Sequence, residues 1–196
     1  MAKIYLPEGR LSYVKLANPE KDEKTGELIY ECTLVVDYDG DDWREDPKFQ
    51  EAIDLFYNTA MNKFGTLDNI HRPMKDPTKE VLETNPWYEG KCIIPLRSRR
   101  IKPDIAHIVG NKAVTLDDWS RVYSGCWAIP TCTAYAYDYK GKKGVSFGLA
   151  TLCKTRDDEP LGAHHDAERD FDDLDVSKFV DNSKLFGKSK GSGSRI

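Results

Sequence analysis

The sequence has no long apolar run and no motif of closely paired cysteines among its 196 residues. Its longest apolar runs, such as Leu34–Val36, are far shorter than the roughly 20 residues that span a membrane. Residues 1–5 also lack the apolar stretch of a signal peptide. We therefore expect a soluble, intracellular protein without a membrane partner.

The five cysteines are scattered, and no two have the C-x-x-C spacing of a zinc or redox site. They are Cys32, Cys92, Cys126, Cys132 and Cys153. We interpret them as reduced thiols buried like small hydrophobic side chains. A cluster of potential metal ligands at His164–Asp166 and Glu168 has acidic and glycine neighbours, which favours a solvated loop. We expect neither a metal nor a cofactor.

Common enzyme signatures are also missing. The chain has no G-x-S-x-G elbow, no Walker A loop and no H-E-x-x-H motif. Asp-Asp pairs at 41–42, 117–118, 157–158 and 172–173 raise the alternative of a metal-dependent DNA-processing enzyme. Adjacent acids on a strand point to opposite sides, so each pair would need a distant partner. We expect a non-catalytic protein.

The length and composition fit one domain followed by a charged tail. A chain of this size buries roughly 70% of the surface that its unfolded form exposes, so it needs no disulfide or metal for stability. Aromatic residues make up 11% of the chain, which is more than a disordered chain carries. We place the domain at residues 1–163 and a flexible, charged C-terminal tail at residues 164–196.

The net charge of −4 conceals a strong segregation of charge along the chain. Residues 157–175 hold nine acids and one base, whereas residues 176–196 hold five bases and one acid. Residues 91–112 and residues 119–156 each hold six bases and one acid. The local field, rather than the net charge, attracts a polyanion, so nucleic acid remains a candidate partner. An acidic tail can also occupy a basic groove until a stronger polyanion displaces it.

Hydrophobic alternation predicts a mainly β protein. Residues 28–38 alternate between apolar and polar side chains, which indicates a half-buried strand that pairs with residues 10–16. Residues 88–98 read as a further strand. Residues 122–139 and residues 145–154 form a long hairpin around a Gly-Lys-Lys-Gly turn.

One amphipathic helix interrupts the strands. Asp46 and Pro47 are typical of an N-cap and the first helical position, and Gly65 suits the C-terminal cap. Between them, apolar side chains recur at spacings of three and four residues: Phe49, Ile53, Phe56, Ala60 and Phe64. This stripe predicts packing against the core. Residues 76–83 are expected to form a second, short helix.

Residues 126–139 mostly alternate between small side chains and side chains with aromatic or hydroxyl groups. Alternation places small, mostly apolar side chains on one face of this strand. The other face carries Trp127, Ile129, Thr131, Thr133, Tyr135, Tyr137 and Tyr139. Flat aromatic groups with a polar tip can form a stacking platform for the bases of single-stranded nucleic acid. We predict that Trp127, Tyr135, Tyr137 and Tyr139 stack bases; the alternative is that they fill the core.

Cations flank this aromatic segment and form a second cluster near residue 100. In single-stranded nucleic-acid binding, such cations follow the phosphates. The predicted phosphate contacts are Arg97, Arg99, Arg100, Lys102, Arg121, Lys140, Lys142 and Lys143. The alternative for the cluster near residue 100 is a solvated strand end.

Several sequence blocks resemble a bacteriophage single-stranded DNA-binding protein family that was long known only as a phage domain of unknown function. The blocks are Gly9–Tyr13, Val122–Trp127, Lys143–Leu149, Lys154–Gly162 and Ala167–Phe171. Each block is weak alone, and together they are specific because they occur in order.

The resemblance implies an OB-fold-like five-stranded antiparallel barrel with a helical insertion. It implies a non-catalytic protein that coats single-stranded DNA without sequence preference in replication, recombination or repair, in the cytoplasm of the host bacterium. It also implies an acidic C-terminal tail that competes with DNA and recruits phage replication proteins. This chain departs from that pattern, because its acidic block is followed by the basic residues 176–196.

Two further possibilities remain open at this stage. The aromatic strand can serve as a protein interface in a phage structural or assembly protein. A homo-oligomer is compatible with either function, and the sequence does not decide it.

Overall fold

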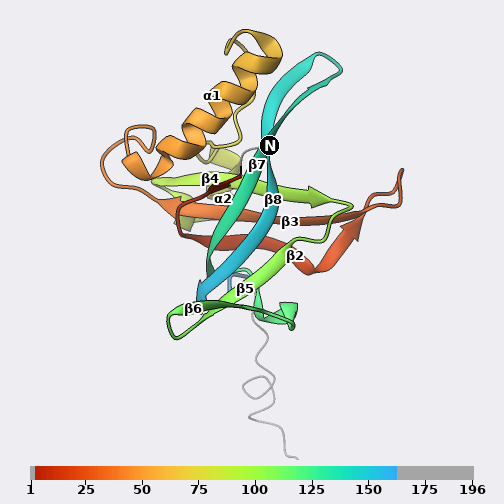
Figure 1. Ribbon diagram of the computed structural model, residues 1–196. Helices are drawn as coiled ribbons and strands as arrows, with labels where there is room; N and C mark the ends of the chain where they lie inside the picture. The colour runs from red at the N-terminus through yellow and green to blue at the C-terminus, as the bar shows by residue number, and fades with distance from the viewer. Residues whose placement is uncertain (1–2, 163–196) are drawn as a thin grey trace, which may run out of the picture. The chain divides into compact units, whose positions relative to one another are not determined.

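The computed structural model describes residues 3–162 and is mainly β (Figure 1). Its strands are β1 (Ile4–Tyr5), β2 (Gly9–Lys21), β3 (Leu28–Asp37), β4 (Lys91–Arg99), β5 (Asp104–Val109), β6 (Lys112–Thr115), β7 (Trp127–Tyr139) and β8 (Lys142–Arg156). Its helices are α1 (Gln50–Phe64) and α2 (Lys79–Thr84), with short 3-10 turns η1 (Pro47–Phe49), η2 (Pro86–Tyr88) and η3 (Trp119–Arg121). No helix in this range is long and apolar enough to cross a membrane. The predicted tail, residues 164–196, lies outside the described residues.

The five long strands close into a barrel. The strands β7, β2, β3, β4 and β8 are neighbours in that order, and β8 pairs again with β7. The predicted OB-fold-like barrel with a helical insertion between β3 and β4 is therefore confirmed. Three short strands extend the sheet to eight: β1 pairs with β7, β5 with β8, and β6 with β5.

The prediction of a purely antiparallel barrel is wrong at one place, where β4 and β8 pair in parallel. The reason is topological: strand directions cannot alternate all the way round a closed ring with an odd number of members. One neighbouring pair must run in the same direction. The pairing of β5 with β8 outside the ring is parallel as well.

The core forms as the alternation predicts. Tyr30, Cys32, Leu34 and Val36 of β3 all point into the barrel interior and are buried. Four of the five cysteines are buried and the fifth is half-buried, and all are free thiols. Burial raises the pKa of the Cys32 thiol to about 12, so the group stays protonated and packs as a small apolar side chain.

Helix α1 covers one end of the barrel and packs against β1, β7 and β8. Asp46 accepts a hydrogen bond from the Lys48 backbone N–H, and the chain enters the helix through the turn η1. Gly65 ends the helix with a φ of 68°, as the capping pattern predicts. The second helix starts later than predicted, because Thr78 caps it while Asp76 accepts a hydrogen bond from the Trp43 indole instead.

In the hairpin of β7 and β8, β8 is longer than predicted, β7 begins at Trp127 rather than at residue 122, and the turn is tighter than predicted. The last cross-strand pair joins Tyr139 to Lys142, which leaves only Lys140 and Gly141 in the turn. Both have positive φ, 51° and 78°, as a two-residue hairpin turn requires. The hairpin extends beyond the barrel beside α1 (Figure 1), and the Lys143 carbonyl accepts a hydrogen bond from the His71 backbone N–H.

Gly125, just before β7, provides a test of this packing. Its φ is 122°, and a Cβ at this position would lie 2.3 Å from the Glu159 carbonyl oxygen. We expect Gly125→Ala to lower the free energy of unfolding by about 2–4 kcal/mol, through backbone strain and displacement of the 159–161 segment. Urea unfolding measures the change.

Gly40→Ala is the matched control, because its φ is 85° but nothing lies within 4 Å of the added Cβ. This variant should lose only about 1 kcal/mol. If both variants lose the same free energy of unfolding, the contact with Glu159 does not contribute to stability.

Candidate nucleic-acid interface

An open groove of about 450 Å³ crosses the outer face of the barrel. Its lining comes from five strands, β2, β3, β4, β8 and β7. Short or flat side chains, Thr33, Pro95 and Ser146, lie among its lining residues, and Thr33 is directly opposite Pro95 across β3 and β4. The groove is therefore a shallow channel over a sheet with hydroxyl groups along it.

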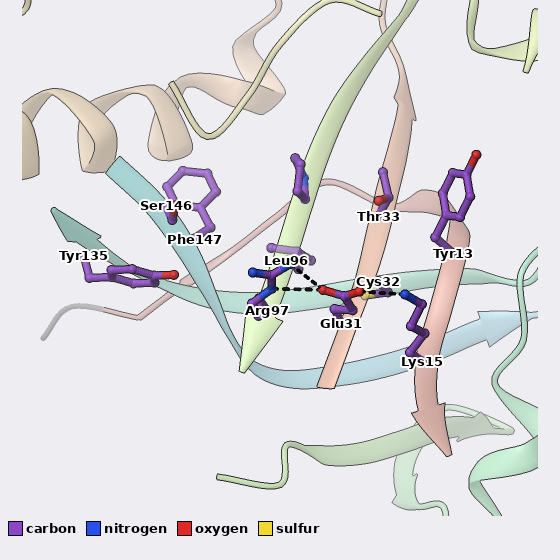
Figure 2. A pocket seen from close by; sticks show the side chains of 11 residues that line it. Tyr13, Lys15, Glu31, Cys32, Thr33, Leu96, Arg97, Tyr135, Ser146 and Phe147 are labelled. Carbon is purple, nitrogen blue, oxygen red and sulfur yellow. Dashed lines mark hydrogen bonds and ion pairs between the residues drawn. The ribbon is translucent and has the colours of Figure 1, made fainter. Parts of the chain in front are cut away.

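A tyrosine lies at each end of the groove (Figure 2). Tyr13 of β2 is 56% exposed, and Tyr135 of β7 is 40% exposed. Tyr13 has a φ of 49° within an irregularity of the β2–β3 pairing, and its hydroxyl accepts a hydrogen bond from Asn85 at 3.0 Å. Both rings present apolar surface to solvent at the channel, which is the arrangement that stacking on flat ligands requires.

An ionic row crosses the floor between the two tyrosines. Glu31 accepts hydrogen bonds from Lys15 Nζ at 3.0 Å and from Arg97 Nε and Nη2 at 2.9 and 2.6 Å (Figure 2). Burial alone would raise the pKa of Glu31, but the hydrogen bonds from Lys15 and Arg97 outweigh it and lower the pKa. The acid therefore stays ionised at neutral pH and partly neutralises two groove cations.

Of the predicted stacking residues, Tyr135 lines this groove and Trp127 does not. The Trp127 indole N–H donates to Asp158 at 2.8 Å, and the Arg156 guanidinium lies 3.9 Å from its ring centroid. The Trp127 side chain therefore contacts Asp158 and Arg156 of the same chain. Tyr137 lies across Gly144 of β8, and Tyr139 is exposed near the hairpin turn.

The predicted alternation of β7 holds for Ala128, Pro130, Cys132 and Ala134, which are buried. It fails at Thr131, which is buried too, because the pairing with β8 shifts register between Thr131 and Cys132. The Thr131 and Thr151 hydroxyl oxygens lie 2.6 Å apart and satisfy each other.

The predicted phosphate contacts separate into three groups in the structure. The first group is the arginine cluster at residues 97–100, in which Arg97 lines the groove while Arg99 and Arg100 pair with Asp22 and Glu27 at the turn between β2 and β3. Lys102 and Arg121 lie near η3 instead, where the Lys102 ammonium is 4.0 Å from the ring centroid of Trp119 and the Arg121 carbonyl accepts from Lys154.

Lys140, Lys142 and Lys143 form the third group, at the end of the β7–β8 hairpin. The Lys140 ammonium lies 5.4 Å from the ring centroid of Tyr139, and the Lys143 ammonium lies 5.7 Å from that of Phe64. None of these three lysines lines the groove, and their role as phosphate contacts stays a prediction, as does that of Arg97.

Sequence reasoning missed Tyr13, Lys15, Thr33 and Ser146 as groove residues. Thr33 and Glu31 were recognisable as the polar face of the strand at 28–38. Tyr13 gave no signal as an exposed aromatic, since its left-handed backbone interrupts the alternation of β2.

A second polar cluster lies where the chain leaves β8; we call it the Asp157–Glu159 clamp. The Arg10 guanidinium donates to the Gly125 and Glu159 carbonyls, at 3.0 and 2.7 Å. Buried Lys154 donates to Asp157 at 2.6 Å, and the Tyr123 hydroxyl donates to the same carboxylate at 2.9 Å. Together with Trp127 and Asp158, these bonds hold the end of the described chain against the barrel.

The closed ring of strands and its open groove define an OB-fold-like protein whose sheet face is accessible to an extended ligand. The chain belongs to the family of the Enterobacter phage Enc34 ssDNA-binding protein, whose family model matches residues 2–180. The resemblance noted in the sequence is thereby confirmed. No curated protein sequence matches the chain significantly.

Solved structures support the same fold. The C-terminally truncated single-stranded DNA-binding protein from bacteriophage Enc34 is 23% identical, with a TM-score of 0.64 over 81% of this chain and 88% of that one. The Enc34 protein in complex with ssDNA gives 23% and 0.64, over 82% and 89%. The single-stranded DNA-binding protein gp2.5 of bacteriophage T7 is 12% identical, with a TM-score of 0.59 over 85% and 98%.

The clamp predicts a specific dependence of stability on pH. Hydrogen bonds from Lys154 and Tyr123 lower the pKa of Asp157, and a hydrogen bond from Trp127 lowers that of Asp158. A carboxyl whose pKa is lower in the folded state stabilises fully above its unfolded pKa of about 3.9, and this contribution is lost progressively as pH falls below that value and through the folded pKa. We expect Asp158→Asn to be less stable than the natural chain at pH 7, and we expect this difference to be smaller at about pH 2.5.

Urea unfolding at both pH values measures this difference. Asp41→Asn, at an exposed acid in the loop before η1, is the control and should show no such convergence. A stability difference for Asp158→Asn that is the same at both pH values would contradict the role of the ionised carboxylate.

Proposed function

We propose that the protein is a non-catalytic, phage-type single-stranded DNA-binding protein that coats its ligand without sequence preference. The observation that carries the proposal is the open groove with Tyr13 and Tyr135 at its two ends and Lys15 and Arg97 between them. Aromatic faces stack on any base, at about 1–3 kcal/mol per base, while nearby cations neutralise phosphates. Membership of the Enc34 family supports the same function.

Shape also favours a single strand over a duplex. The groove is a shallow channel across a sheet, and its aromatic rings are useful only to bases that are unpaired and accessible. Its hydroxyl groups, from Thr33 and Ser146, can bond to any base edge, sugar or phosphate. Binding with little sequence preference follows from these groups.

The wider biological role rests on the family. Membership in a phage family supports a place in phage DNA replication, recombination or repair, in the cytoplasm of the host. Recruitment of replication proteins by the acidic segment at residues 157–175 belongs to the same proposal. Most of that segment lies outside the described residues.

Titration of a fluorescent thymidine oligonucleotide tests the proposal. We expect the fluorescence anisotropy to rise on binding and the affinity to fall steeply with added salt, because phosphate contacts release counterions. Stable higher oligomers without salt-sensitive DNA binding would favour a structural role. Loss of the DNA only in the presence of Mg²⁺ or Mn²⁺ would favour a DNA-processing enzyme.

Tyrosine variants assign the binding to the groove. We expect Tyr13→Ala and Tyr135→Ala each to weaken binding by about 1–3 kcal/mol, the value of one base stack. Tyr5→Ala is the matched control, since Tyr5 is 71% exposed on β1 and does not line the groove. If Tyr5→Ala weakens binding as much as the groove variants, the groove is not the site.

Glu31 generates a separate prediction, because its carboxylate occupies the position between two cations that a phosphate would take. We expect Glu31→Gln to bind the thymidine oligonucleotide about fivefold more tightly, since removing the competing charge is worth about 1 kcal/mol. The slope of log affinity against log salt should steepen by about 0.7 for each additional phosphate contact.

Glu20→Gln is the control for this variant. Glu20 also pairs with Lys15, at 2.6 Å, but it does not line the groove. Weaker binding by Glu31→Gln would mean that the acid positions Lys15 and Arg97 rather than competing with the ligand.

A further inference from the structure

A second open hollow of about 430 Å³ lies between helix α1 and strand β7. The helix contributes Thr59, Asn62 and Lys63, which are an alcohol, an amide and a cation. The strand contributes Ala134, Tyr135 and Ala136, and the two alanines project only methyl groups toward the hollow. The hollow is therefore polar on its helical side and flat on its strand side.

Tyr135 connects this hollow to the groove, because it lines both. Tyr135 is 40% exposed, so it stands at the boundary between the two cavities. A flexible polymer that leaves the groove past Tyr135 therefore enters the second hollow. A small ligand would occupy one of the two cavities, whereas a polymer can occupy both.

A further cation, Lys143, lies near the end of α1 that borders the hollow. The Lys143 ammonium lies 5.7 Å from the ring centroid of Phe64, the residue that follows Lys63. Backbone hydrogen bonds between His71 and the β8 residues Lys143 and Val145 hold the hairpin next to the segment after α1 (Figure 1). Lys143 of the hairpin thus lies near the C-terminal end of α1, which also contributes Lys63 to the hollow.

We propose that the hollow between α1 and β7 is an additional nucleotide subsite that receives single-stranded DNA as it leaves the groove over Tyr135. Lys63 and Lys143 neutralise its phosphates, and Asn62 and Thr59 bond to the base or sugar. This inference rests on the proposed function and lengthens the binding path from the sheet onto the helix.

The double variant Asn62→Ala/Lys63→Ala tests the subsite, since alanine favours a helix at both of these exposed or partly exposed positions. We expect about tenfold weaker binding of a thymidine oligomer of about 12 nucleotides, within the range that one OB fold covers. Binding of an oligomer of about 4 nucleotides, which the groove alone can hold, should be unchanged. The salt slope for the long oligomer should fall by about 0.7, for one lost phosphate contact.

Lys112→Ala is the charge-matched control, because Lys112 is exposed on β6, well away from α1 in Figure 1. If this variant loses as much affinity as the double variant, or if short and long oligomers lose equally, the subsite is refuted. Unchanged affinity of the double variant for the long oligomer also refutes it. The proposed function fails separately, when the natural chain binds neither oligomer.

Ultraviolet crosslinking of the natural chain gives evidence that does not depend on the stability of a variant. Peptides from the crosslinked complex are identified by mass spectrometry. We expect thymidine adducts on the peptide containing residues 59–63 with the long oligomer and none there with the short one. Adducts confined to groove peptides with both oligomers would overturn the proposal.

Discussion

Closure of the barrel by the parallel pairing of β4 with β8 is the constraint on which the candidate site depends. This pairing places Leu96 beside Phe147 in the core and Arg97 beside Gly148 on the outer face. Without it, the sheet would end at β4, and the tyrosine of β7 would lie on a separate edge from the tyrosine of β2. A ring with an odd number of strands requires one such parallel pair, so the groove is a consequence of the way the barrel closes.

The shape of the outer face depends on missing side chains as much as on those present. A Cβ at Gly144 would lie 2.3 Å from the Tyr137 hydroxyl, and one at Gly148 would lie 3.1 Å from the Thr133 hydroxyl oxygen. The side chains of β7 can therefore lean over β8 at these two positions. Tyr135 stands between them, opposite the small Ser146, and remains free to border both the groove and the hollow beside α1.

Patterns within one element were predictable from the sequence, and contacts between distant elements were not. The alternation of β3 and the capped helix at residues 46–65 depend on near neighbours, so both were predicted well. Alternation also placed Trp127 correctly on the outer face of β7. It could not show that Asp158 and Arg156 occupy its ring, since those residues reach it only when the barrel has formed. Three of the family-like blocks meet at the Asp157–Glu159 clamp, and one of them also contributes Tyr13 to the groove, so their similarity reflects packing of the chain as well as function.

The arginines at residues 97–100 do not present unpaired positive charge to solvent, because each of them forms an ion pair with an acid. Arg97 pairs with Glu31, Arg99 with Asp22, and Arg100 with Glu27. A polyanion that binds here exchanges one carboxylate for one phosphate at each cation, and such an exchange between two solvated ion pairs changes the free energy little. In the proposed function, the net affinity then comes mainly from base stacking and from counterions released by the phosphates.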